Sequence, residues 1–250
     1  MSTWLASPNL YERTRGVTVN SSLRVPILMY HDIVYLPHNS LGMSPQQFAR
    51  EMQYLHDHGF HTINLGQLYA AMYHGYRLPS RPIVLTFDDG YESVYTNAYP
   101  VLKRYGFQGT VFMISGFVGH HGRHPFLTWG ELSTMQRSGV IDVESHTVHH
   151  IDLATASDAQ IQYELQASAA TLEQHLHHPI RYFCYPSGQF RAQTLVDLRR
   201  DGYLLAATEH PGYARSSDGP YELRRLRVYE DMPLSTFAGM LAESNASTAS

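Results

Sequence analysis

The chain has 250 residues, of which 43% are hydrophobic and 16% are charged, and its formal net charge is −4. This length fits one α/β domain of barrel size or two small domains, and the hydrophobic share is enough for a sizeable core. The mild charge, without a basic block, argues against a nucleic acid or an anionic membrane as a partner.

Both ends of the chain differ in composition from residues 25–242, which we expect to form one domain. Residues 1–24 lack the charged start and apolar middle of a signal peptide, so we expect a polar extension or tether there. Residues 243–250 are small and polar, which predicts a flexible tail. No apolar stretch is long enough to span a bilayer. Two locations stay open: the cytoplasm, or the cell surface or extracellular space with an anchor removed.

Apolar runs alternate with helix-start signals along the whole chain. The expected strands are 25–30, 61–65, 83–87, 110–114, 141–144, 182–184, 204–207 and 226–228. The expected helices are 45–58, 67–74, 91–105, 129–138, 158–177, 193–201 and 234–241. Ser44, Thr128 and Ser157 are the expected N-caps. About seven strand–helix units in regular alternation predict a parallel sheet covered by helices.

Two adjacent acids follow the apolar run 82–85. Asp88 and Asp89 come directly before Gly90. Neighbouring carboxylates repel each other, so the pair is costly unless a cation or a shared proton offsets the repulsion. The alternative is a solvated turn, since Asp-Asp-Gly is common in turns.

A histidine cluster follows a later apolar run. His146 and His150 are four residues apart, and on a first helical turn this spacing would place both rings on one face. With Asp89 they would form the open three-ligand set of a catalytic zinc site, and Asp88 would be left to act as a base. Spacing alone leaves His149 open as an alternative ligand.

These candidates follow the carboxyl ends of several expected strands. His31 follows the first strand, the acid pair follows 83–87, the histidines follow 141–144 and Tyr185 follows 182–184. Barrel enzymes carry their active sites on that face. An open doubly wound sheet is the alternative, but it gathers its chemistry at one switch point. We therefore predict a (β/α) barrel.

With these two motifs in this order and spacing, the chain resembles the polysaccharide deacetylases, the carbohydrate esterase family with a NodB-type homology domain. Residues 86–90 match its first motif, and residues 146–150 match its His-[Ser/Thr]-x-x-His motif. The resemblance implies Asp88 as catalytic base. It implies Asp89, His146 and His150 as ligands of Zn2+ or of another divalent metal such as Co2+ or Ni2+. It also implies a distorted barrel with fewer than eight regular strands.

A third motif is present in altered form at residues 181–188. The resemblance implies that the backbone N–H of Tyr185 donates to the oxyanion. Many members carry an arginine at the position of Cys184, where it braces the catalytic acid. Arg225 aligns with an arginine that often precedes the last strand in this variant, so it is the candidate substitute.

Residues 26–32 resemble the subgroup of biofilm exopolysaccharide (poly-N-acetylglucosamine) deacetylases, in which the catalytic histidine precedes the acid motif. This implies His31 as the general acid. Trp129, Tyr185 and Pro186 are the candidate substrate-binding residues, although aromatic side chains more often serve packing. Three loop histidines (His120, His121 and His124) suggest either a second metal site or a solvated polar loop.

The expected function is a metal-dependent hydrolase that removes N-acetyl groups from a polysaccharide containing N-acetylglucosamine, such as a biofilm glycan, peptidoglycan or a chitin-like chain. An O-acetyl esterase acting on xylan could use the same site, with less need for His31 because an ester leaving group is less basic. A carbohydrate-binding protein with an inactive barrel and a two-metal phosphoesterase are the remaining alternatives.

Overall fold

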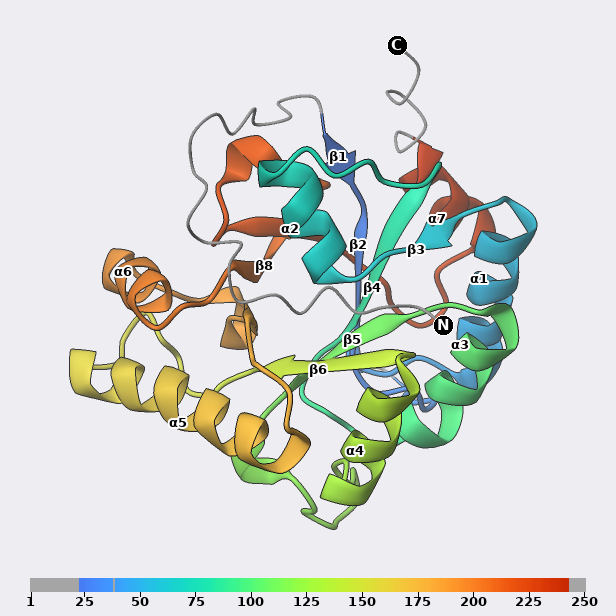
Figure 1. Ribbon diagram of the computed structural model, residues 1–250. Coiled ribbons are helices and arrows are strands. Elements are labelled where there is room, and N and C mark those ends of the chain that lie inside the picture. The colour runs from blue at the N-terminus through green and yellow to red at the C-terminus, as the bar shows by residue number, and fades with distance from the viewer. Residues whose placement is uncertain (1–22, 38, 243–250) are drawn as a thin grey trace.

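The computed structural model describes residues 23–37 and 39–242 (Figure 1). The expected tether up to residue 22 and the expected tail 243–250 lie outside the described residues. Arg24 belongs to a short strand, β1 (Arg24–Val25), which pairs antiparallel with β9 (Ala214–Arg215). The described fold therefore includes Arg24, which the sequence had placed in the extension.

Seven parallel strands close into a barrel. They are β2 (Ile27–Tyr30), β4 (Pro82–Phe87), β5 (Gly109–Met113), β6 (Ile141–Ser145), β7 (Tyr182–Cys184), β8 (Leu205–Pro211) and β10 (Leu223–Arg227). Their order is β2-β10-β8-β7-β6-β5-β4, and β2 pairs with β4 to complete the ring. All these pairs are parallel. The predicted distorted barrel is confirmed, and the open doubly wound sheet is excluded.

An eighth parallel strand, β3 (His61–Thr62), stays outside the ring. It pairs with the first two residues of β4, whereas β5 pairs with the last two. The expected strand 61–65 was too long because Asn64 caps the next helix, α2 (Leu65–Tyr73), through a capping box with Gln67.

Helices surround the strands (Figure 1). They are α1 (Pro45–Asp57), α3 (Tyr99–Tyr105), α4 (Trp129–Ser138), α5 (Asp158–Leu176), α6 (Ala192–Arg200) and α7 (Leu234–Met240). Ser44, Thr128 and Ser157 cap α1, α4 and α5 as predicted.

The helix expected at 91–105 begins differently from the prediction. One turn of π-helix, Val94–Ala98, precedes α3, and the N–H of Tyr99 donates to the carbonyl of Val94. Pro100 has no N–H for a bond to the carbonyl of Thr96, which favours a wider turn at this point.

Alternate residues of each strand face two different cores. Ile83, Leu85 and Phe87 pack with the outer helices, whereas Val84 belongs to a second apolar cluster inside the barrel, closed by α2. Because side chains alternate along a strand, Asp88 shares the interior side with Val84. The same alternation on β10 places Arg225 on the interior side.

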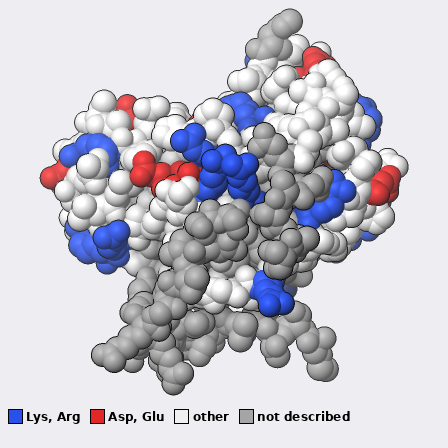
Figure 2. Space-filling view, turned by 90° about the horizontal axis from the view of Figure 1, so that it is seen from above, with Lys and Arg blue, Asp and Glu red and all other residues white. Residues whose placement is uncertain are grey.

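Figure 2 shows where the charged side chains of the described residues lie on one face of the molecule. Lys and Arg side chains form separate groups there among mainly uncharged side chains. In the part of the chain that the structure describes, no helix is both long and apolar enough to cross a membrane.

Candidate active site

A left-handed turn presents the acid pair at the end of β4. Asp89 has a φ of 70° and Gly90 a φ of 88°. A Cβ on Gly90 would lie 2.1 Å from the Met113 sulfur, so both the backbone conformation and the lack of space require glycine. This turn holds the Asp88 and Asp89 carboxylates together at the carboxyl end of the barrel.

The histidine motif forms a tight irregular turn and not the predicted helical turn. Thr147 and His150 have left-handed φ values of 69° and 57°. The N–H of His150 donates to the Thr147 hydroxyl oxygen over 2.9 Å. The helical explanation of the spacing was therefore wrong, because left-handed residues at both positions interrupt a helix.

Asp89, His146 and His150 converge on one point. The Asp89 Oδ1 atom lies 3.4 Å from Nε2 of His146 and 3.5 Å from Nε2 of His150. Nδ1 of His146 lies 2.7 Å from the Cys184 carbonyl oxygen, which can only accept, so Nδ1 carries the proton. When the His146 ring is neutral, Nε2 therefore carries the lone pair that a metal ion would bind. Acceptor atoms this close suit a divalent cation, so the residues fit a metal site.

His149 is held away from this group by Glu164 of α5. One Glu164 oxygen accepts from the N–H groups of Val148 and His149 over 2.7 and 2.9 Å, and the other lies 2.8 Å from His149 Nδ1. The geometry therefore places His150, and not His149, beside Asp89. Sequence reasoning missed Glu164, although an acid on the buried stripe of a helix was a usable signal.

Arg225 binds Asp88 through two parallel hydrogen bonds. Its NH1 donates to Oδ1 and its NH2 to Oδ2, each over 2.7 Å. The other N–H groups donate to the Thr208 carbonyl, the Thr86 hydroxyl and the Cys184 sulfur over 2.8, 3.1 and 3.1 Å. All five guanidinium donors thus have acceptors although the side chain is buried.

This pairing sets the charge of the buried acid. Burial alone disfavours the ionised form of Asp88, but the charge and hydrogen bonds of Arg225 outweigh it and hold the Asp88 pKa well below its usual range. Burial also raises the pKa of the Cys184 thiol, whose S–H faces Asp88 Oδ2 at 3.5 Å. The interior therefore holds an ionised carboxylate beside a neutral thiol.

His31 also lies close to Asp88. Its Nε2 is 3.8 Å from Asp88 Oδ2, and the residue is buried. Burial lowers the His31 pKa, and the negative charges of Asp88 and Asp89 partly oppose this shift. The sequence predicted His31 on the same face of the barrel as the acid motif, and the closure of β2 onto β4 brings the two together.

Asp32 connects the end of β2 to the loop between β5 and α4. It accepts from the Ser93 hydroxyl over 2.6 Å and lies 3.1 Å from Nδ1 of His124. His120 and His121 belong to none of the possible metal-binding groups found between residues 23 and 242. His124 therefore serves as a partner for Asp32 in this structure.

The expected substrate-binding residues are largely occupied by packing. The ring of Tyr185 is fully buried against Phe190, and its hydroxyl donates to the Tyr221 carbonyl over 2.9 Å. Pro186 is buried beside it. Trp129 stacks on His175 with 3.9 Å between ring centroids. No Tyr185 ring face is left for a sugar, because the side chain fills the core.

The Tyr185 N–H also has a partner. It donates to the Ala207 carbonyl over 3.2 Å, within the pairing of β7 with β8. This distance lies at the upper end of the ordinary range of about 2.7–3.2 Å for N–H···O bonds.

A second polar cluster ties β6 to the segment before β7. His178 Nε2 lies 3.0 Å from Asp142 and 3.4 Å from Glu144, and the other Glu144 oxygen accepts from the N–H groups of Arg181 and Tyr182. Burial raises the Glu144 pKa to about 8. Burial opposes the His178 charge, but the two carboxylates outweigh it and raise the His178 pKa to about 10.

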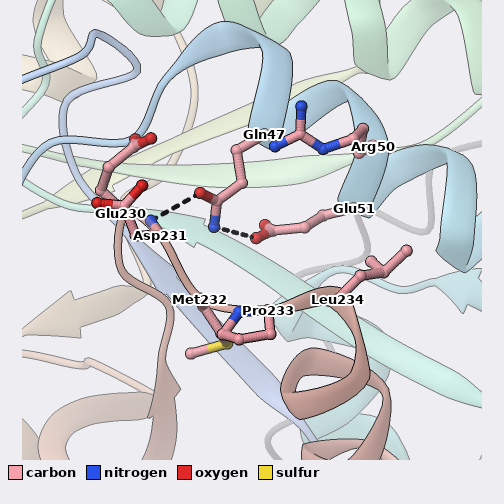
Figure 3. A pocket seen from close by; sticks show the side chains of 8 residues that line it. All are labelled: Gln47, Arg50, Glu51, Glu230, Asp231, Met232, Pro233 and Leu234. Carbon is pink, nitrogen blue, oxygen red and sulfur yellow. Dashed lines mark hydrogen bonds between the residues drawn. The ribbon is translucent and has the colours of Figure 1, made fainter.

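A cavity of about 290 Å³ lies outside the barrel, between α1 and the segment before α7 (Figure 3). Burial raises the pKa of Glu51 in this cavity to about 7, and Glu51 accepts hydrogen bonds from Tyr30 and Gln47. The residues that line the cavity are Gln47, Arg50, Glu51, Glu230, Asp231, Met232, Pro233 and Leu234. None of them belongs to the group around Asp88.

Comparison with known proteins agrees with this geometry. The family described as polysaccharide deacetylase matches residues 75–206. YxkH of Bacillus subtilis, which is named for the same family, is 34% identical over 87% of this chain and 76% of its own length. The poly-β-1,6-N-acetyl-D-glucosamine N-deacetylase of Staphylococcus aureus is 26% identical over 76% of this chain and 69% of its own length.

Among solved structures, the Streptococcus pyogenes deacetylase PplD in complex with acetate is similar, with a TM-score of 0.81 and 30% identity. The match covers 88% of this chain and 98% of PplD. The family match, the relative from B. subtilis and the shared barrel lead to one conclusion: this chain belongs to the polysaccharide deacetylase family.

Proposed function

We propose that this protein is a metal-dependent hydrolase that removes N-acetyl groups from a polysaccharide containing N-acetylglucosamine. One observation carries the proposal: Asp89, His146 and His150 converge beside the Asp88–Arg225 pair, at the carboxyl ends of the barrel strands. A binding protein would need no ionised acid next to a metal site.

Poly-N-acetylglucosamine is the polymer that the comparisons favour. The S. aureus relative is named for its action on poly-β-1,6-N-acetyl-D-glucosamine, and PplD binds acetate, the acid that deacetylation releases. Peptidoglycan and chitin-like chains present the same acetamido group and belong to the same proposal. Such polymers favour action outside the cell or at its surface.

The donor set suits Zn2+, with Co2+ and Ni2+ as alternatives, because two imidazoles and one carboxylate leave coordination positions open. A cation bound there would polarise the acetyl carbonyl and lower the pKa of an attacking water.

Asp88 is the proposed general base. Arg225 keeps it ionised and fixes its orientation. Each carboxylate oxygen has two acceptor sites, so the two bonds from Arg225 leave room to accept a proton from water. Asp88 thereby acts as the proton acceptor while Asp89 serves the metal site.

His31 is the proposed general acid. Its Nε2 lies close enough to Asp88 for both groups to reach one substrate carbon. An amine leaves readily only after it has gained a proton, which an imidazolium at this position can donate.

The Tyr185 N–H remains the proposed oxyanion donor. Tyr185 directly follows the carboxyl end of β7, and in this role its N–H would share or give up its bond to the Ala207 carbonyl in favour of the developing negative charge. This is a role for the Tyr185 backbone alone.

Acetate release from N-acetylglucosamine oligomers, measured in parallel with release from acetylated xylan, tests the proposal. We expect release from the glucosamine oligomers that a chelator abolishes and zinc restores. Asp88→Asn should abolish turnover while the protein still binds one metal ion. Release from xylan alone would contradict the de-N-acetylase assignment and favour an O-acetyl esterase.

A further inference from the structure

A separate group of possible metal ligands lies near the amino end of β6. Asp142, Glu144 and His178 each offer one atom, and these atoms all lie within 4.8 Å of one another. Asp142 and Glu144 belong to β6, and His178 lies in the segment between α5 and β7 (Figure 1). The group around Asp89 follows the carboxyl ends of β4 and β6, so the two groups share no side chain.

The His178 ring lies close to both carboxylates. Its Nε2 atom is 3.0 Å from Asp142 Oδ1 and 3.4 Å from Glu144 Oε1. In the group around Asp89, the two distances between carboxylate and imidazole atoms are 3.4 and 3.5 Å. Two oxygens and one nitrogen at such distances can bind one divalent cation, with a coordination position left for water.

Neighbouring groups hold both carboxylates in place. The other Glu144 oxygen accepts from the N–H groups of Arg181 and Tyr182 over 2.9 and 2.8 Å. The Gln136 side chain donates to Asp142 Oδ1 over 3.0 Å. The fold therefore orients the two carboxylates before an ion binds, as outer partners do in metal sites.

Both carboxylates are buried without a lysine or arginine beside them. The exposed fractions of Asp142 and Glu144 are 8% and 0%. In the part of the chain that the structure describes, no lysine or arginine forms an ion pair with either residue. When both are ionised they carry two negative charges, and a protonated His178 offsets only one of them. A divalent cation would offset both charges and leave the imidazole neutral.

A buried hydroxyl lies on the same face of the sheet as Asp142. Thr110 of β5 is paired with Asp142 in the parallel register, so both side chains lie on that face. Thr110 is fully buried, and its hydroxyl has no hydrogen-bond partner among the described residues. Buried polar groups of this kind are rare, because they cost free energy unless a partner binds them. A water molecule bound to an ion at Asp142 can donate a hydrogen bond to this hydroxyl.

We propose that Asp142, Glu144 and His178 form a second metal site, which binds Zn2+ and ties β6 to the segment before β7. One imidazole and two carboxylates are ligands that zinc accepts. Its role is structural, because the site lies away from the carboxyl ends of the strands, where barrel enzymes carry their chemistry. The inference goes beyond the proposed function and does not depend on it.

This second site should bind zinc more weakly than the site at Asp89. The Cys184 carbonyl accepts from Nδ1 of His146 and so orients that ring, whereas no hydrogen bond engages Nδ1 of His178 in the described part of the chain. An outer partner of this kind is worth about 10–100-fold in affinity. The ion must also displace the proton that His178 Nε2 directs at the carboxylates. Dialysis should therefore empty the second site and leave the first site filled.

Calorimetric titration of His146→Ala with Zn2+ tests the second site, because this variant lacks a ligand of the first one. We expect one Zn2+ per chain, with a Kd about 10–100-fold above that of the first site in the wild type. His178→Gln in the same background should raise this Kd about tenfold or more. His121→Gln removes a histidine that belongs to no group of possible ligands between residues 39 and 242, so it should leave zinc binding unchanged.

Thermal unfolding separates loss of the site from loss of the fold. Excess Zn2+ should raise the Tm of His146→Ala, because an ion that binds only the folded state stabilises it. The double variant with His178→Gln should unfold cooperatively at a Tm that zinc does not change. If this variant fails to fold, Asp142→Asn in the same background replaces it, with the same expected results.

Two results would overturn the second site. One is the absence of zinc binding by His146→Ala under conditions in which the wild type binds zinc. The other is equal zinc binding by His146→Ala with and without His178→Gln. Neither result depends on whether the protein releases acetate, so failure of this site is distinguishable from failure of the proposed function.

Discussion

Arg225 and Asp88 form a planar, two-point ion pair inside the barrel, with both N–O distances at 2.7 Å. Arg225 comes from the last strand of the ring and Asp88 follows its second strand in chain order. The two strands are not neighbours, since β2 lies between them. The pair therefore spans the barrel interior and positions the proposed base.

The first prediction concerns this pair. Arg225→Lys keeps the positive charge but cannot form two parallel hydrogen bonds to the carboxylate, so the Asp88 side chain should shift. The kcat for acetate release should then fall about 100-fold, because a displacement of about 1 Å can have an effect of this size. Arg225→Ala should also lower the free energy of unfolding by about 3–5 kcal/mol, because a buried charge is left unpaired. Arg224→Lys, at the exposed neighbouring position, is the control for both measurements. A fully active Arg225→Lys variant would show that the two-point hydrogen bonding to Asp88 is not required.

The second prediction compares neighbouring histidines. His146→Ala and His150→Ala should lose stoichiometric zinc after dialysis, because each removes a nitrogen that faces Asp89. His149→Ala should retain one zinc per chain and lose only stability, because its ring contacts Glu164 instead. Elemental analysis gives the metal content, and thermal unfolding gives the stability. If His149→Ala alone lost its zinc, His149 would be the metal ligand and the assignment of His150 would be wrong.

The sequence predicted the residues of the candidate metal site better than the contacts that hold these residues in place. The spacing of His146 and His150 and the acid pair were readable because they form short local motifs. The left-handed turn at Thr147 could not be predicted in this way. Glu164 holds this turn by binding the N–H of Val148, and the two residues are 16 positions apart in the chain. A contact between distant segments leaves no local pattern.

Local sequence patterns also predicted only part of the fold. Alternating strands and helices predicted the barrel, and caps such as Ser157 predicted where helices begin. The pairing of β1 with β9 and the position of β3 outside the ring depend on how distant strands meet. Likewise, the Tyr185 side chain was expected to contact the substrate, but it is buried in the core and stacks on Phe190.

The third prediction concerns Cys184, where many family members carry an arginine. The Arg225 guanidinium lies 3.1 Å from the Cys184 sulfur and binds the Asp88 carboxylate beside it. Cys184→Arg would bury a second guanidinium beside the first, so we expect a strong loss of thermal stability. Cys184→Ala removes one acceptor and should cost about 1–3 kcal/mol.

The double variant Cys184→Arg with Arg225→Ala checks this explanation. It should be more stable than the sum of the single effects predicts, because one guanidinium then occupies the space near Asp88. Strict additivity in denaturant unfolding would show that the two positions do not compete.

The fourth prediction is a pH dependence of stability from His178. Its pKa is about 10 in the folded protein against 6.5 for the free side chain, so the folded state binds more protons between these values. The contribution is complete below pH 6.5 and is lost as the pH rises toward about 10. The free energy of unfolding of His178→Gln should therefore fall less steeply than that of the wild type in this window. His121→Gln, in an exposed loop, should behave as the wild type does in urea unfolding at each pH.

The arrangement of the barrel also has a consequence during synthesis. The proposed metal-binding side chains are complete once His150 has been made, but the partner of Asp88 is residue 225. At about 5–20 residues per second, a ribosome needs roughly 4–15 s to cover this interval. A growing chain can therefore carry every proposed metal ligand while its proposed base still lacks a counter-charge. The growing chain would then be able to bind a metal before it is able to hydrolyse a substrate. It would gain the second ability only when the last strand closes the barrel.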